Sequence, residues 1–134
     1  MSIFLPDTNA VSVYLRGADN VLVARMRAEY PHLRLSTIVL AEREFGILRH
    51  EAGLRFQSRF EQLIATVQVE PFTREDARHY ARIRNALEKR GQGIGPLDTL
   101  IAAQALRLGA TVVTHNTREF ARLPGLKCED WQTV

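Results

Sequence analysis

Three acidic residues stand at positions from which they could do chemistry together. Asp7 directly follows an apolar run at residues 3–5, Glu42 borders the apolar stripe of a predicted helix, and Asp98 falls within the apolar face of another. A lone buried carboxylate tends to take up a proton, so ionised acids that gather at one place require a cation. A metal site built from carboxylate oxygens, with no Cys and no pair of His, favours Mg²⁺ or Mn²⁺ over zinc. Such a metal activates water and neutralises phosphate charge.

Each acid also has an ordinary structural explanation, and the sequence leaves both open. Asp7 could cap the helix that follows it, although Thr8 or Asn9 can do so instead. Glu42 has no cation three or four residues later with which to pair. Asp98 lies in the first turn of its helix, where the helix dipole favours an anion. The apolar stripes on which these assignments depend are Ile38, Ala41, Phe45 and Leu48 beside Glu42, and Ile101, Ala102, Ala105 and Leu108 beside Asp98.

A further polar cluster follows the apolar run near residue 112. Thr114, Asn116 and Glu119 lie within six residues of one another at a predicted strand end. Asn116 and Thr117 could simply cap a short helix with Glu119 in its first turn. Alternatively, the cluster lies beside the three acids at one crevice.

Short strands that alternate with helices must position these groups. Strands are predicted at residues 3–5, 33–36, 67–69, 111–114 and, as an edge strand, 126–128. Helices are predicted at about residues 10–15, 21–30, 38–50, 54–65, 74–90 and 96–108. This order predicts an α/β sandwich with a mostly parallel central sheet. Ligands bind beyond the carboxyl ends of such strands, where Asp7 and Thr114 lie.

Size and composition describe an ordinary globular chain. Its 134 residues suit one domain over 1–134. No apolar run approaches the roughly 20 residues of a membrane span, and residues 1–10 lack the basic start of a signal peptide. Cys128 is the one cysteine, which excludes an internal disulfide and a Cys-cluster zinc site. We therefore expect a cytoplasmic protein without membrane contact.

The positively charged side chains of the protein could bind nucleic acid. The formal net charge is +3, and 16 of the 18 cations are Arg, whose planar fork suits phosphate. Arg74, Arg78 and Arg82 form an i, i+4, i+8 row that could follow a phosphate backbone, although a solvated helix face is the commoner arrangement. Phe56, Phe60 and Phe120 could stack on bases, but their helical spacing is more typical of core residues, and Trp131 is predicted to be a packing anchor.

Histidine provides the competing chemistry. A pair of histidines acting as acid and base would cleave RNA without metal and leave 2′,3′-cyclic phosphate ends. The four candidates are His32, His50, His79 and His115. His115 alone lies near the predicted acid site.

The chain resembles the PIN-domain ribonucleases of the VapC toxin group over essentially its whole length. The resemblance is carried, in this order, by residues 5–9, 36–42, 94–98, 114–120, 123–126 and 129–131. The resemblance implies a three-layer α/β/α fold and a Mg²⁺- or Mn²⁺-dependent nuclease site. Asp7, Glu42 and Asp98 match the three core acids of the family. Asn116 occupies the fourth acidic position, where Glu119 supplies the charge.

The resemblance also implies a reaction and partners. A metal held by Asp7 and Asp98, with Glu42 bound directly or through water, would hydrolyse an RNA phosphodiester, and Glu42 or Glu119 would orient or deprotonate the water. The substrate implied is initiator tRNA, cut in the anticodon stem-loop, although another tRNA or rRNA stays open. The supporting residues are Thr8, Asn9, Thr114 and Asn116, with Arg118 joining the arginine row as an RNA contact.

A VapB antitoxin and a homodimer are further implications, with contacts from the apolar helices between residues 21 and 65.

Two residues depart from the family pattern: Pro6 precedes the first acid and is expected to alter strand pairing, and Gly93 is expected to loosen the loop before Asp98. A function from another class also stays open, namely a non-catalytic module whose acidic pocket binds a partner.

Overall fold

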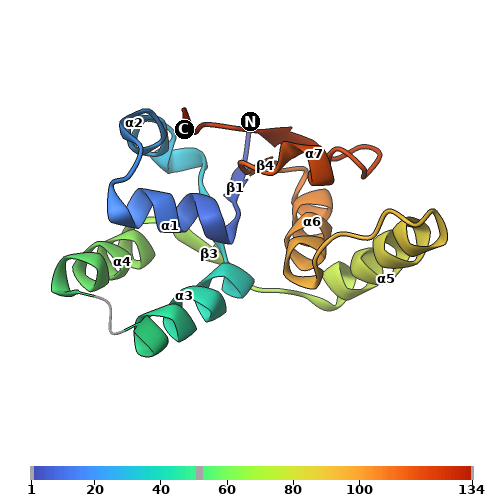
Figure 1. Cartoon of the computed structure of the whole chain (residues 1–134), viewed down its shortest axis with the longest axis horizontal. Helices are drawn as coiled ribbons and strands as arrows, with labels where there is room; N and C mark the ends of the chain where they lie inside the picture. The colour runs from blue at the N-terminus through green and yellow to red at the C-terminus, as the bar shows by residue number, and fades with distance from the viewer. Residues whose placement is uncertain (1, 51–52, 134) are drawn as a thin grey trace.

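In the part of the chain that the computed structural model describes, residues 2–50 and 53–133, five short parallel strands run through the middle of the fold (Figure 1). They are β1 Phe4–Pro6, β2 Arg34–Ser36, β3 Gln68–Glu70, β4 Thr111–Val113 and β5 Lys127–Glu129. Strands β1, β4 and β5 pair in the order β1-β4-β5, and β2 pairs with β3. A parallel bridge between Phe4 and Leu33 joins the two groups. The predicted parallel sheet is therefore confirmed, including its edge strand.

Helices cover both sides of these strands. They are α1 Thr8–Arg16, α2 Asn20–Ala28, α3 Thr37–His50, α4 Leu54–Thr66, α5 Arg74–Lys89, α6 Pro96–Leu108 and α7 Thr117–Phe120, with a 3₁₀ turn at Tyr30–His32. In Figure 1, α1 to α4 lie on one side and α5 and α6 on the other, which gives the predicted three layers. Among the described residues, no helix is both long and apolar enough to cross a bilayer. One domain over 1–134 stays a prediction, because residues 1, 51, 52 and 134 lie outside the described part.

Local sequence signals explain most helix ends. Pro96 opens α6 and Gly109 closes it with φ of 64°, a left-handed conformation that glycine adopts without steric cost. Thr73 caps α5 and forms a capping box with Asp76. Helix α2 ends at Ala28, earlier than predicted, and Tyr30–His32 forms the 3₁₀ turn. The φ of Pro31 suits such a turn, whereas its missing N–H cannot continue an α-helix.

The wheel predicted for α3 is wrong about which face meets the core. Val39 is its fully buried residue, whereas Phe45 is 54% exposed and Leu48 is 80% exposed. The apolar side chains of this helix point in several directions, so periodicity alone does not identify the face that meets the core. Phe45 and Leu48 instead form part of the surface near Glu42.

At the first strand end, the structure decides which residue caps the following helix and shows that the expectation for Pro6 is wrong. Asp7, and not Thr8 or Asn9, caps α1 by accepting a hydrogen bond from the Ala10 N–H at 2.8 Å. Pro6 pairs in register with Val113, and the ladder continues where the Asp7 N–H donates to the Val113 carbonyl at 2.9 Å. Successive N–H groups of a strand point to opposite sides, so the missing N–H of Pro6 falls on the side away from β4.

The core lies between the strands and the inner helix faces. Phe60 and Phe120 are buried in it, as the core interpretation predicted, and Phe56 is half-buried against it. Trp131 is buried, and its ring packs edge-to-face against the Phe4 ring with 5.0 Å between the two ring centroids, which confirms its role as a packing anchor.

Two buried polar networks tie α6 to the strands and to α5. The Ser36 hydroxyl donates to Gln104 at 2.5 Å, and the Gln104 amide donates to the Glu70 carbonyl at 3.0 Å. Farther along α6, Arg107 binds both oxygens of Asp76, at 2.6 and 3.2 Å. These contacts hold α6, and therefore Asp98 in its first turn, in a fixed position.

Candidate active site

Asp7 leaves β1 at the carboxyl end of the sheet and is only 5% exposed. Burial is the main reason that its pKa is raised, and the negative charge of Asp130 raises it further. Hydrogen bonds from Thr114 and from the Ala10 N–H, together with His115, oppose the shift. Asp7 is therefore both a helix cap and a buried carboxyl aimed at the crevice, so the two explanations for it coexist.

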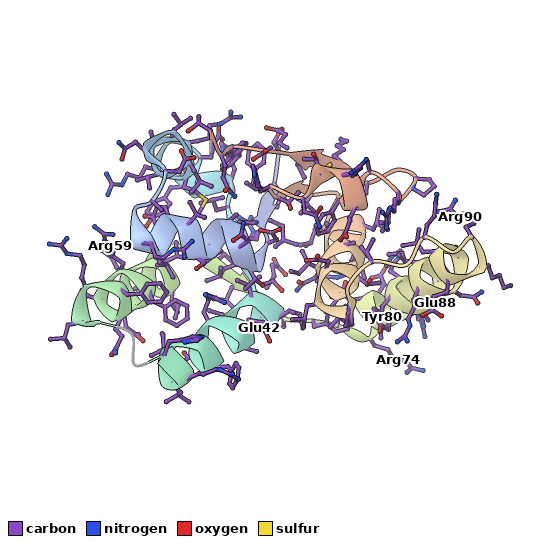
Figure 2. All side chains as sticks on the ribbon, viewed as in Figure 1. Glu42, Arg59, Arg74, Tyr80, Glu88 and Arg90 are labelled. Atoms are coloured by element: carbon purple, nitrogen blue, oxygen red, sulfur yellow. The ribbon has the colours of Figure 1, made fainter. Side chains whose placement is uncertain are left out.

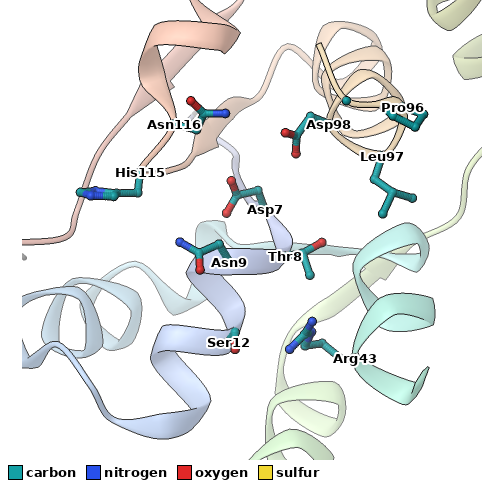
Figure 3. A pocket seen from close by; sticks show the side chains of 11 residues that line it. Asp7, Thr8, Asn9, Ser12, Arg43, Pro96, Leu97, Asp98, His115 and Asn116 are labelled. Atoms are coloured by element: carbon teal, nitrogen blue, oxygen red, sulfur yellow. The ribbon is translucent and has the colours of Figure 1, made fainter. Parts of the chain in front are cut away.

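Asp98 faces Asp7 from the first turn of α6 (Figure 3). Burial, followed by the charges of Asp7 and Glu119, raises the pKa of Asp98 to about 6. Like charges that lie this close disfavour joint ionisation. The structure thus brings the carboxyls of Asp7 and Asp98 together in the way that their sequence positions predicted.

The two carboxyls line a cavity of about 720 Å³, which we call the acid cavity. Its other walls come from α1, from residues 95–97 before Asp98, from α3 through Arg43, and from residues 115 and 116. Thr8 is half-buried in this wall, and its hydroxyl oxygen has no hydrogen-bond partner in the described part of the chain. A cavity at the carboxyl ends of parallel strands is the expected ligand position in this class of fold.

The segment after β4 completes one side of the acid cavity. The Asn116 N–H donates to the Thr114 hydroxyl at 2.9 Å, and the Asn116 amide donates to Glu119 at 2.8 Å. Thr114 is buried and reaches back to Asp7. The sequence cluster at residues 114–119 therefore lies beside the acids, and Asn116 orients Glu119 toward the charge of Asp98.

Glu42 belongs to a neighbouring hollow. It lines a second cavity of about 710 Å³, which we call the arginine cavity because Arg16, Arg43 and Arg49 line it. Figure 2 shows Glu42 on α3. Across residues 2–50 and 53–133, no three His, Cys, Asp or Glu side chains lie close enough together to form a metal-binding group. The structure thus places Asp7 and Asp98 in the same cavity and Glu42 in the neighbouring one.

The donor set fits a hard divalent cation. Burial is the main reason that the pKa of Asp7 and of Asp98 is raised, and nearby carboxylates add to it: Asp130 for Asp7, and Asp7 and Glu119 for Asp98. A bound cation would stabilise both carboxylates. Their oxygens, with those of Glu119 and the Asn116 side chain nearby, are the ligand type that Mg²⁺ and Mn²⁺ prefer. Asp7 and Asp98 are the residues that would hold such an ion, and a metal role for Glu42, which lines the neighbouring cavity, stays a prediction.

The raised pKa of Asp98 predicts a pH-dependent stability difference in EDTA. A carboxyl with a raised folded-state pKa contributes stability below about pH 4 and loses it as the pH rises through about 6. Because the introduced amide stays neutral, the Asp98→Asn variant should match the wild type at pH 4. At pH 7 it should exceed the wild type by about 1–2 kcal/mol, a figure discounted because the group is half exposed. Urea unfolding of both proteins at the two pH values measures this difference, and an equal difference at both would contradict it.

Of the remaining predicted residues, Asn9 lies at the acid cavity, whereas the arginines predicted to contact RNA do not line it. Asn9 is exposed on α1 at the cavity wall, and Arg118 is exposed on α7. The arginine row is exposed on α5 and lines neither cavity, and Figure 2 shows Arg74 pointing away from the molecule. Its RNA contact stays a prediction.

The histidines do not form a pair. His115 lies at the acid cavity, where its ring nitrogen is 2.9 Å from Asp130. His32 pairs with Glu29, His50 lines the arginine cavity, and His79 is on α5. An acid–base pair of histidines therefore has no support in this arrangement.

Two residues that line both cavities were not predicted from the sequence. Arg43 and Ser12 line both the acid cavity and the arginine cavity. Arg43 directly follows Glu42, and Ser12 follows Thr8 by one helical turn. Those two spacings are the signals that could have identified them.

Comparisons with known proteins indicate one family for the whole chain. A model of the PIN domain matches residues 4–126. The tRNA(fMet)-specific endonuclease VapC of Salmonella typhimurium is 32% identical over 128 residues, which cover 96% of this chain and 97% of that protein. The structure of DNA-bound VapBC from the same organism superposes with a TM-score of 0.86 at 32% identity, covering 98% of this chain and 99% of that one. VapBC2 of Rickettsia felis, bound to a promoter DNA fragment, gives a TM-score of 0.88 at 27% identity, covering 97% and 99%.

Proposed function

The chain belongs to the PIN domain family and is a VapC-type ribonuclease, and we propose that it cleaves tRNA with a divalent metal held by Asp7 and Asp98. The observation that carries this proposal is the pair of facing carboxyls at the end of the parallel sheet, each with a raised pKa. The Salmonella typhimurium relative is named for initiator tRNA, which makes that tRNA the first substrate to test. Cleavage in the anticodon stem-loop is part of the proposal.

The residues of the site have distinct roles in this reaction. Mg²⁺ or Mn²⁺ supplies charge neutralisation at the phosphate and lowers the pKa of water. Asp7 is held in place by the Ala10 N–H and by Thr114. Glu119 accepts a hydrogen bond from the Asn116 amide on Oε2, so its Oε1 can take a proton from the attacking water as the P–O bond to the water forms and the P–O3′ bond breaks. The leaving 3′-oxygen takes its proton from solvent water. The products carry 5′-phosphate and 3′-hydroxyl ends.

The metal requirement gives a direct test of the reaction. With purified protein and total tRNA in Mg²⁺, EDTA should lower the cleavage rate by at least about a hundredfold, and Mn²⁺ or excess Mg²⁺ should restore it. Sequencing of both ends of the products should show 5′-phosphate and 3′-hydroxyl groups at one position. Cleavage that survives EDTA and leaves 2′,3′-cyclic phosphates would contradict the proposal. Absence of any cleavage in Mg²⁺ would support the non-catalytic, partner-binding alternative.

Partners follow from the same family. The similar solved structures are VapBC complexes, and the proposal includes a VapB-type antitoxin that blocks this site in the cytoplasm. A homodimer is also proposed. Leu48 of α3 and Leu54 of α4 are exposed large apolar side chains, as contact helices between residues 21 and 65 require.

A further inference from the structure

Arg43 connects the two cavities beside the acids. It extends from α3 and lines the acid cavity together with Asp7 and Asp98, and it also lines the arginine cavity. In Figure 3 its guanidinium reaches from α3 toward α1. A strongly basic side chain therefore stands where a ligand leaving the acid cavity would pass.

Arg43 has a buried donor without a partner. Its Nε is covered from solvent and makes no hydrogen bond to any described residue of the chain. Nearby Arg16 repels it, and the nearby acid is its own neighbour Glu42. Buried polar groups in native proteins are nearly always paired, and a guanidinium in a cavity wall whose Nε–H has no partner is suited to an anionic ligand.

Helix α1 supplies a line of donors along the same path. Thr8, Ser12 and Arg16 are spaced i, i+4 and i+8 and therefore share one helix face. Thr8 and Ser12 line the acid cavity, whereas Ser12 and Arg16 line the arginine cavity. Each step of four residues advances about 6 Å along the helix, so this face offers donors at intervals to a chain of phosphates.

The arginine cavity has the composition of a single-strand groove. Arg16, Arg43 and Arg49 line it against one carboxylate, Glu42. Phe45 and Phe56 are also in its wall, and the Arg49 guanidinium lies 5.8 Å from the centroid of the Phe45 ring. Basic side chains beside aromatic rings bind the backbone and the bases of single-stranded nucleic acid.

We propose that Arg43, with Ser12 and Arg16, binds the backbone phosphate that neighbours the scissile phosphate, so that the RNA strand runs from the acid cavity into the arginine cavity. This proposal rests on the proposed function. Arg43 contacts substrate in this role and takes no part in the proton transfer. The arginine cavity is thereby assigned to RNA, although the sequence pointed to the row on α5.

The test uses an RNA oligonucleotide that contains the mapped cleavage site. Arg43→Gln should raise KM about tenfold or more and change kcat by less than about twofold, and Arg43→Lys should recover most of the loss. Lys89→Gln, a single charge removed at the far end of α5, should match the wild type. The Mg²⁺ affinity and the unfolding midpoint of Arg43→Gln should equal those of the wild type, which separates phosphate binding from an indirect effect on Glu42.

A chemical change in the RNA identifies the phosphate. One uncharged methylphosphonate is placed at the linkage on either side of the scissile phosphate. At one of these two positions it should raise KM about tenfold for the wild type and leave KM for Arg43→Gln unchanged. If Arg43→Gln cleaves with the KM of the wild type, or loses only kcat, the subsite is overturned and the cavity is left for a protein partner. Loss of all cleavage in the wild type would instead refute the proposed function.

Discussion

Asp98→Asn is expected to lower kcat for tRNA cleavage by at least about 1000-fold, equivalent to about 4 kcal/mol of transition-state stabilisation. The substitution removes one of the two carboxylates that face each other in the acid cavity. An amide oxygen is a weaker and uncharged ligand, so the affinity for Mg²⁺ should fall as well. Single-turnover cleavage with saturating protein measures the chemical step, and calorimetric titration with Mg²⁺ measures the binding.

The folded state should tolerate this change, because Asn is close to Asp in size and relieves repulsion. The charges of Asp7 and Glu119 both disfavour ionised Asp98. In EDTA at pH 7 the variant should therefore unfold at a higher temperature than the wild type while being nearly inactive. An inactive protein that is also less stable would indicate damage to the fold. A variant that cleaves tRNA at the wild-type rate would refute the assignment of Asp98 to the metal site.

Glu88→Gln serves as the control for Asp98→Asn. Glu88 lies near the far end of α5, where it pairs with Arg84 at 2.9 Å on the exposed surface (Figure 2). Such exposed pairs contribute about 0–1 kcal/mol. Loss of this carboxylate should leave both cleavage and Mg²⁺ affinity unchanged, which shows that the effect at Asp98 depends on its position in the acid cavity.

The sequence predicted Asp7 and Asp98 because local patterns carry the relevant information. An acid directly after a buried strand must lie at the sheet edge, and the wheel of α6 places Asp98 beside residues that the structure buries, such as Ile101 and Ala102. The prediction of Glu42 rests on the family resemblance, because the helical wheel that placed it beside the core identified the wrong face of α3. In α3 apolar residues occupy several directions, and tertiary packing of Val39 decided which of them met the core.

Long-range pairing is the part of the structure that periodicity does not encode. Arg107 and Asp76 are 31 residues apart, so helical periodicity gives no sign that Asp76 is fully buried against this arginine. Arg43 was missed for a related reason: its significance comes from two cavities whose walls include α1 and α3 together. Spacing along one helix cannot show which side chains another helix brings opposite to it.

Asp76→Ala is expected to lower the free energy of unfolding by about 3 kcal/mol and the unfolding midpoint by about 10 °C. Asp76 is fully buried and accepts hydrogen bonds from Arg107 and from the Thr73 N–H, the latter at 2.8 Å. The Arg107 side chain is only 19% exposed. Without Asp76, the acidic group that still contacts its guanidinium is Glu70, at 3.7 Å. The N-terminal cap of α5 also loses half of its capping box.

A double-mutant cycle separates the ion pair from loss of packing. The Asp76→Ala/Arg107→Ala protein should be at least about 1.5 kcal/mol more stable than the sum of the single changes predicts, because neither charge is then left buried alone. Glu88→Ala removes an exposed pair from the same helix and should cost less than about 1 kcal/mol. If Asp76→Ala costs no more than Glu88→Ala, the buried pair does not stabilise the packing of α5 against α6.

The position of this pair also predicts what Asp76→Ala will leave unchanged. Arg107 follows Asp98 by nine residues on α6, which is about 13 Å along the helix axis. The acid cavity contains neither Asp76 nor Arg107. Well below its unfolding midpoint, Asp76→Ala should therefore keep the kcat of the wild type within about twofold, whereas Asp98→Asn loses activity and gains stability. Opposite effects of two acid substitutions on stability would show that one carboxylate supports the fold and that the other strains it to serve the reaction.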